Sequence, residues 1–336
     1  MSEPAASGET TVTAQRLCDW PVVEFGAAAG YGPIFNAGVI VVDGVYHLFA
    51  RGVRDGYRRN GGAGPRFVDY VSDLLVFTSE DGLEYRFQQV LATGADEGAH
   101  SLEDPRVQRV RSGGDEVVML TYTHLPAPES GRPWQVGVHR LVYEDGHFAL
   151  NRSSGRVVGP AGLPDKDAVI FNLRDGRVAL IHRIHPDIQL ALFNSLEQLY
   201  DPEPGYWEAH LRELDRHTLI RPADGALGVG AGAPPVPTAA GLLFFYHERR
   251  EDGHYTLKVA LLDEETGRLL ALLSEPLLAP ELSWEREGDV DNVVFVQGAV
   301  LRGDRTIYLT YGAADRCIGA ANVEAELLLR ALAAAA

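Results

Sequence analysis

The sequence predicts an all-β protein folded as a five-bladed β-propeller, with a helical extension at its C-terminus. Hairpin-like segments recur about every 60 to 70 residues along the 336-residue chain, and further strand-like segments bring each repeat to about four strands. Such a period is typical of radial repetition, in which each repeat forms one blade. A β-sandwich with a second domain is the alternative, but it leaves the period unexplained.

The five repeats share one pattern: a leading residue, a short apolar strand, a turn rich in Gly or Asp, and an aromatic or β-branched strand. They span residues 35–52, 103–124, 165–184, 230–250 and 291–315. Their leading positions are Asn36, Asp104, Lys166, Gly232 and Asn292. A hairpin returns to the end at which it started, and the first strands of a propeller line its channel. We therefore expect these positions to converge on one face.

Three regions are expected along the chain. Residues 1–15 should form a disordered tail, which lacks the basic and apolar parts of a signal peptide. Residues 16–321 should form a single propeller, because no linker divides them. Residues 322–336 should form a helix, since this segment is rich in Ala, Leu and Glu and has no Gly or Pro.

Composition and charge limit the partners. A formal net charge of −17 argues against nucleic acid or an anionic membrane, because both attract clustered Lys and Arg. No apolar run reaches the roughly 18 residues that a membrane helix needs. The two cysteines, Cys18 and Cys317, fit a reducing compartment, so we expect a cytoplasmic protein. Their pairing and a homo-oligomeric state stay open.

The segment LEDPR at residues 102–106 supplies the candidate acid. Pro105 fixes its own backbone and favours an extended conformation for Asp104, which predicts a stiffly mounted carboxylate. A surface ion pair between Asp104 and Arg106 is the simplest alternative. Inverting cleavage of a glycosidic bond needs such an acid at the leaving oxygen and a nucleophile on the opposite face of the sugar.

The open ends of the other hairpins bring basic groups opposite this acid. If the nucleophile is phosphate, a cluster of cations replaces the second carboxylate of a hydrolase, and guanidinium and ammonium groups are the usual phosphate ligands. The residues that match are Lys166, His182 and Arg183, with Arg51 and Arg106 near by. The alternatives are a local ion pair of Lys166 with Asp167, a structural role for His182, and a turn cap for Asn292. No HExxH, GxSxG or Cys-based motif appears, so no metal is predicted.

Together these motifs resemble glycoside hydrolase family 130, which contains mannoside phosphorylases and β-mannosidases. The resemblance covers all five repeats in order, and its motifs are EDPR at 103–106, KDA at 166–168, HR at 182–183, GAGAPPV at 230–236 before a strand ending in Tyr246 and His247, NVVFVQG at 292–298 and YGAAD at 311–315. It implies a five-bladed propeller, inversion at a β-mannosidic bond, and inorganic phosphate as co-substrate without any cofactor or metal.

The resemblance also assigns roles to single residues. Asp104 would be the general acid, acting through the 3-hydroxyl of the mannose. Asn36, Arg51 and Asp315 would bind the mannosyl residue, and Lys166 and His182 would bind phosphate. The hairpin pattern, rather than the resemblance, adds Arg106, His247 and Asn292 as substrate-binding residues and Arg183 as a phosphate-binding residue. Two departures, Thr123-His124 in place of a phosphate-facing Arg or Asn and AGLL without a Trp at 240–243, leave the acceptor sugar and linkage open.

The expected activity is phosphorolysis of manno-oligosaccharides, or of mannosyl-glucose or mannosyl-N-acetylglucosamine, to α-mannose 1-phosphate. A β-mannosidase, with Asp167 or Glu248 as base, and a non-catalytic glycan-binding propeller are the alternatives.

Overall fold

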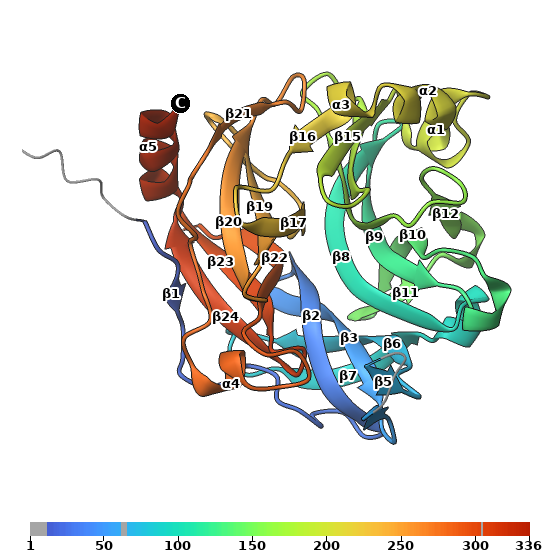
Figure 1. Cartoon of the computed structure of the whole chain (residues 1–336), viewed down its shortest axis with the longest axis vertical. Helices are drawn as coiled ribbons and strands as arrows, with labels where there is room; N and C mark the ends of the chain where they lie inside the picture. Colours follow the sequence, from blue (N-terminus) through green and yellow to red (C-terminus); the bar gives the residue numbers. More distant parts are fainter. Residues whose placement is uncertain (1–11, 62–65, 304) are drawn as a thin grey trace, which may run out of the picture.

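The computed structural model describes residues 12–61, 66–303 and 305–336. Within these residues the strands form five sheets of four or five strands and one two-stranded ribbon. The sheets lie around a common centre in the order of the chain (Figure 1). This arrangement confirms the predicted five-bladed propeller with few helices.

The first three blades each begin with the strand nearest the centre (Figure 1). Blade one contains β2 (Tyr31–Val42), β3 (Val45–Arg54), β6 (Ser72–Ser79) and β7 (Arg86–Ala92). Blade two contains β8 (Ser101–Ser112), β9 (Asp115–Leu125), β10 (Gln135–Glu144) and β11 (His147–Leu150), with β12 (Arg156–Val158) paired to β10. Blade three contains β13 (Lys166–Asn172), β14 (Val178–Arg183), β15 (Ile188–Phe193) and β16 (Thr218–Ile220).

The last blade joins the two ends of the chain. Blade four contains β17 (Ala226–Ala231), β19 (Gly241–Arg250), β20 (Tyr255–Leu262) and β21 (Leu269–Leu272), with β18 (Val236–Thr238) paired to β19. Blade five contains β22 (Val294–Leu301), β23 (Thr306–Ala313), β24 (Cys317–Glu324) and, from the N-terminal side, β1 (Gln15–Arg16). Because β1 pairs with β24, the ring is closed and β24 has no open edge along this pairing.

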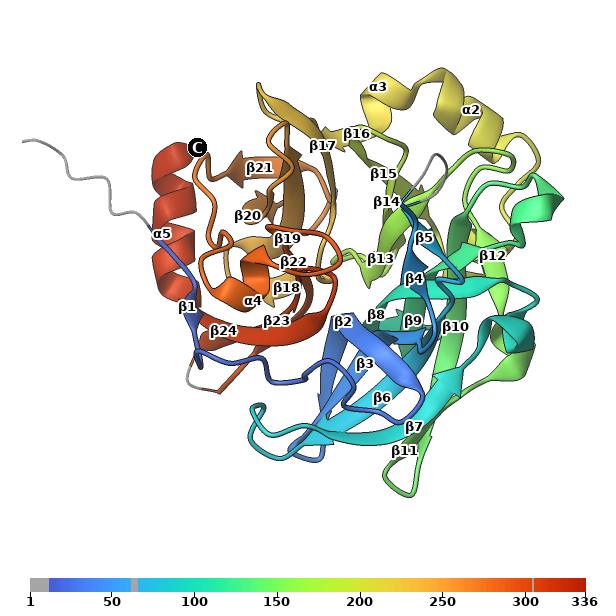
Figure 2. The same cartoon turned by 60° about the horizontal axis from the view of Figure 1, so that its bottom comes forward.

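The remaining elements lie outside the blades. The ribbon of β4 (Arg58–Arg59) and β5 (Phe67–Val68) is an insertion in blade one, as Figure 2 shows. The helices are α1 (Leu196–Tyr200), α2 (Tyr206–Arg212), α3 (Leu214–His217), α4 (Ser283–Arg286), α5 (Ala325–Ala335), and the 3₁₀ turns η1 (Gly94–Glu97), η2 (Pro128–Ser130) and η3 (Arg152–Ser154). None of the described helices is long and apolar enough to cross a bilayer.

The propeller and the C-terminal helix begin at positions that differ from those expected from the sequence. Ala14 is buried and donates its N–H to the Leu277 carbonyl at 2.8 Å, and Gln15 belongs to β1, so the propeller begins before residue 16. The rest of the predicted tail, residues 1–11, lies outside the described part of the chain. The C-terminal helix begins at Ala325 rather than at residue 322, because residues 322–324 complete β24.

The core is divided among the contacts between blades. The described residues form five apolar clusters, and each cluster fills the space between two neighbouring sheets. Phe49 of blade one, for example, packs in one cluster with Leu120 of blade two. Both Cys18 and Cys317 are free thiols, and Cys317 lies in the cluster between blades four and five.

Candidate active site

Three central strands share one irregularity near the ends at which the candidate residues lie. Asn36, Asp104 and Asp167 have positive φ angles of 50°, 54° and 51°, and strand pairing changes register at each of them. Asn and Asp tolerate this left-handed conformation better than other residues with side chains. A β-bulge re-aims a side chain, so these irregularities position the polar groups. The extended backbone expected for Asp104 is therefore wrong.

The bulges also correct the alignment of two repeats. In blade three the bulged residue is Asp167, one position after Lys166. In blade five the register changes at Gln297, which is fully buried. Asn292 instead precedes β22 in a turn that its backbone N–H and carbonyl stabilise by hydrogen bonds. This placement fits the turn-cap alternative for Asn292, and its predicted substrate contact stays a prediction.

The acidic part of the site surrounds one guanidinium. Asp104 is 3% exposed, and its Oδ1 accepts hydrogen bonds from Asn36 Nδ2 at 2.9 Å and from Arg51 Nη1 at 3.4 Å. Arg51 also forms an ion pair with Glu103. The structure thus brings together Asn36, Arg51 and Asp104 from blades one and two, as the hairpin pattern predicted. Glu103, to which the sequence analysis assigned no role, belongs to the same group.

Asp315 completes this acidic group from blade five. It follows the end of β23 and has a φ of 52°. Burial raises the pKa of Asp315 to about 7, and the negative charges of Asp104 and Glu103 act in the same direction, against Arg51 and Lys166. Burial likewise raises the pKa of Glu103. The site therefore holds a carboxyl group whose pKa is raised toward neutral pH.

The basic part of the site surrounds Asp167. Its carboxylate faces Arg106 Nη2 at 3.2 Å, Arg183 Nε at 3.1 Å and His247 Nε2 at 3.6 Å. Burial alone would raise the pKa of Asp167, but Arg183, Lys166, His247 and Arg106 together lower it well below its usual range. Lys166 is partly buried, and among the described residues its ammonium has no hydrogen-bonded or ion-paired partner. Its donors are therefore open to a ligand.

His247 is neutral at physiological pH. Burial lowers its pKa to about 3, and Arg183 and Arg106 oppose the effect of Asp167. Its ring packs against Phe295 with a centroid distance of 4.0 Å. Gly230 allows this packing, because a Cβ at that position would lie 2.5 Å from both Asp167 Oδ2 and His247 Nε2. The glycine-rich segment therefore passes close to Asp167 and His247.

Arg106 supports the site from within and does not present free donors to it. It is 1% exposed, and it donates hydrogen bonds to the carbonyls of Asp104 at 3.0 Å, Gly232 at 2.8 Å and Ala231 at 2.7 Å, besides its contact with Asp167. The predicted role of Arg106 in substrate binding stays a prediction. Its guanidinium ties blades two, three and four together at the channel.

The two ring nitrogens of His182 also contact protein side chains. It is fully buried, with Nδ1 2.9 Å from Asp165 Oδ2 and Nε2 3.3 Å from His210 Nε2 of α2. Both ring nitrogens therefore have protein partners, which fits the structural alternative, and the predicted phosphate contact stays a prediction. Asp165 also accepts a hydrogen bond from the backbone N–H of Arg183, so this pair fixes the end of β14.

Tyr70 lies at the site, although the sequence did not single it out. The Arg51 guanidinium lies 5.6 Å from the centre of the Tyr70 ring, and this ring stacks on Phe67 of the β4–β5 ribbon at 4.7 Å. Tyr70 is partly buried, and an aromatic ring beside polar groups can support the apolar face of a sugar. The residue falls in an insertion outside the five repeats, so only its aromatic character could have indicated it.

Comparisons with known proteins agree with this architecture. A family model described as beta-1,4-mannooligosaccharide phosphorylase matches residues 16–333. A 1,2-beta-oligomannan phosphorylase of Thermoanaerobacter sp. (strain X514) is 30% identical over 326 residues, which cover 92% of this chain and 97% of that protein.

Solved structures share the fold at low identity. A beta-1,2-mannobiose phosphorylase from Listeria innocua, in complex with beta-1,2-mannobiose, superposes with a TM-score of 0.73 at 19% identity, covering 96% of this chain and 99% of that one. A member described among glycoside hydrolases that target beta-1,2 mannosidic linkages in Candida mannan superposes with a TM-score of 0.68 at 19% identity, covering 96% and 95%.

Proposed function

This chain belongs to glycoside hydrolase family 130, and from that premise we propose that it is an inverting phosphorylase of β-mannosides. A phosphate oxygen attacks the anomeric carbon of the terminal mannose as the bond to the leaving oxygen breaks. Asp104 supplies the proton to that oxygen, by way of the mannose 3-hydroxyl. The products are α-mannose 1-phosphate and a mannoside that is shorter by one residue.

The state of Asp167 carries this proposal. A hydrolase needs a carboxylate that can take a proton from water, whereas the cations Arg106, Arg183 and Lys166 keep the pKa of Asp167 low. Such a carboxylate is a poor base. Next to it, Lys166 has no protein partner among the described residues, and Arg183 keeps part of its side chain exposed at 17%. These two cations are suited to an anionic nucleophile.

We further propose that the linkage cleaved is β-1,2. Two of the similar proteins are described as acting on β-1,2-linked mannosides by phosphorolysis. Asn36, Arg51 and Asp315 would hold the mannosyl residue, since their polar groups surround Asp104. Tyr70 would support the apolar face of one sugar.

Hydrolysis is the second candidate function, and the raised pKa of Asp315 is the observation that favours it. A carboxylate with a pKa raised to about 7 can act as a general base at neutral pH. Asp315 or Glu103 would then replace the bases expected from the sequence. Glu248 is a weaker candidate, because its carboxylate contacts the Ala223 N–H at 3.3 Å and Lys258 at 4.0 Å.

Product analysis separates these functions. The protein is incubated with β-1,2-mannotriose and, in parallel, with β-1,4-mannotriose, each with and without inorganic phosphate. Formation of α-mannose 1-phosphate only when phosphate is present supports the proposal. Free mannose that forms equally without phosphate would show a β-mannosidase, and saturable binding without turnover would show a glycan-binding propeller. Turnover of the β-1,4 substrate alone would refute the proposed linkage.

A further inference from the structure

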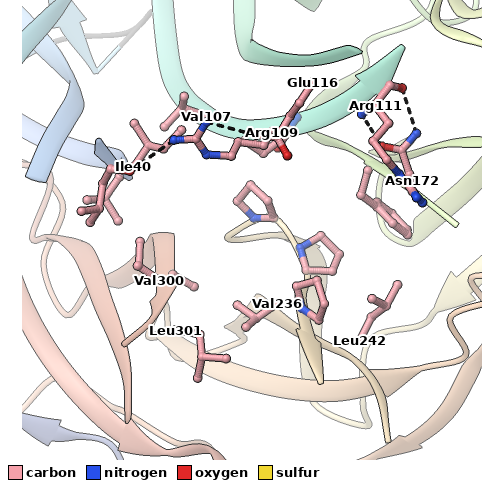
Figure 3. Close-up of a pocket in the computed structure, with 18 residues that line it drawn as sticks. Ile40, Val107, Arg109, Arg111, Glu116, Asn172, Val236, Leu242, Val300 and Leu301 are labelled. Atoms are coloured by element: carbon pink, nitrogen blue, oxygen red, sulfur yellow. Dashed lines mark hydrogen bonds and ion pairs between the residues drawn. The ribbon is translucent and has the colours of Figure 1, made fainter. Parts of the chain in front are cut away.

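A cavity opens near the ends of the central strands that lie opposite the candidate active site. It has a volume of about 780 Å³ and is lined by the far ends of the central strands, including Val41 of β2, Val107 of β8 and Leu301 of β22 (Figure 3). We call it the rear pocket. The candidate residues Asn36, Asp104 and Lys166 lie toward the opposite ends of the same strands.

Arg106 separates the two sites. Its guanidinium spans from blade two to the carbonyls of Ala231 and Gly232 in blade four and to Asp167 in blade three. Arg106 is 1% exposed, and it directly precedes Val107, which lines the rear pocket. None of the residues proposed for mannoside cleavage lines the rear pocket.

The rear pocket has one apolar side and one polar side. One side is apolar and includes Val236, Leu242, Ala299 and Leu301, whereas the polar side chains of β8 and Asn172 face them across the space (Figure 3). A volume of several hundred Å³ with mostly apolar walls and a few polar groups is typical of small-molecule sites. The division favours an amphipathic ligand.

Gln108 is the first polar group that points to an occupant. It lines the pocket, it is only 8% exposed, and neither its amide nitrogen nor its amide oxygen has a hydrogen-bond partner among the described residues. A buried amide that lacks hydrogen-bond partners destabilises the protein unless another group or a ligand pairs with it. A ligand that satisfies it must offer both a donor and an acceptor.

The charged side chains at the rim of the rear pocket set a second requirement for the ligand. Arg109 is paired with Glu116 at 3.1 Å, so its charge is largely compensated. Arg111 donates one hydrogen bond to the Leu173 carbonyl at 3.2 Å and forms no ion pair with any described carboxylate. The rim therefore carries one excess positive charge, which favours an anion.

We propose that the rear pocket binds an aliphatic hydroxy acid. Its hydroxyl group donates to and accepts from the Gln108 amide, its carboxylate faces Arg111, and its hydrocarbon chain lies against the apolar wall. A sugar fits this site less well, since one buried amide cannot pair with many hydroxyls.

Isothermal titration calorimetry on the full chain tests the proposal with three probes: 2-hydroxyoctanoate, octanoate without the hydroxyl, and 1,2-octanediol without the carboxylate. We expect 2-hydroxyoctanoate to bind about tenfold more tightly than either of the others. In Gln108→Leu the preference over octanoate should fall below about twofold, and in Arg111→Gln the preference over the diol should fall similarly. Arg86→Gln, an exposed change on β7, should keep both preferences.

Two further results decide whether the ligand occupies this cavity. Ala299→Phe fills the pocket without changing its charge, and it should abolish binding while mannoside phosphorolysis, measured in parallel, shows that the variant is folded. Binding that survives Ala299→Phe would place the ligand elsewhere and overturn the proposal. The absence of saturable binding by the folded wild-type protein would also overturn the proposal and would indicate that water pairs with Gln108. A concentration-dependent dimer whose formation Ala299→Phe prevents would overturn it too, because a second copy of the chain would then cover the pocket.

Discussion

Replacement of Lys166 by Met tests the proposed phosphate site most directly. The change removes the ammonium group and keeps most of the side-chain volume. Because the ammonium has no described protein partner, the change should leave no protein group unpaired. The loss is then that of one charge-assisted hydrogen bond to phosphate, about 1.5 to 3 kcal/mol. This corresponds to a fall of roughly 10- to 150-fold in kcat/KM for phosphate.

Initial rates of phosphorolysis, measured at saturating mannoside and varied phosphate, give this value. KM for the mannoside should change by less than about threefold, since Asn36, Arg51 and Asp104 are untouched. Lys258→Met is the matched control, because Lys258 lies on β20 and its ammonium contacts the Ser274 carbonyl and Glu248. The control should leave KM for phosphate unchanged. If Lys166→Met does the same, Lys166 does not bind phosphate.

Four further changes test other parts of the site. Asp104→Asn should lower kcat by roughly 10²- to 10⁴-fold with an unchanged melting temperature, and near-normal turnover would remove Asp104 as the acid. Arg106→Met should lower the free energy of unfolding, measured in urea, by about 3 to 5 kcal/mol, because it leaves the buried Asp167 carboxylate without this ion pair. A loss below about 1 kcal/mol would contradict the supporting role of Arg106. Ionising Asp315 costs folding free energy as pH rises from about 4 to 7, because its folded pKa is about 7. Asp315→Asn should therefore match the wild type near pH 4 and exceed its stability by about 2 to 4 kcal/mol at pH 8, whereas a constant difference across this range would refute the raised pKa. His182→Gln should leave KM for phosphate within about twofold while lowering stability by about 1 to 3 kcal/mol, and a tenfold rise in this KM would restore His182 to the phosphate site.

The blades were predictable because their pairing is local. A turn between two β-rich segments brings strands such as β2 and β3 together without help from the rest of the chain. The convergence of Asn36, Arg51 and Asp104 followed from the same rule, since each lies near an open hairpin end. The closing strand β1 was missed because its partner β24 lies about 300 residues away in the sequence.

The roles of Arg106 and His182 were not predictable for a related reason. A buried cation or imidazole takes its role from its partners, and these come from distant segments, namely the carbonyls of Ala231 and Gly232 and the side chain of His210. The motifs mark both residues as important, but motif membership does not distinguish a group that binds substrate from one that holds the site in shape.

Protonation of Asp315 links the two halves of the site. When Asp315 is neutral, the four cations Arg51, Arg106, Lys166 and Arg183 face three carboxylates, so the site carries one excess positive charge toward an incoming phosphate. When Asp315 ionises, this excess disappears, and the new negative charge opposes the effect of Lys166. A pKa near 7 places this change within the range in which phosphate itself becomes a dianion. A protonated Asp315 thus leaves this excess positive charge in place for an anionic nucleophile, whereas an ionised Asp315 removes it.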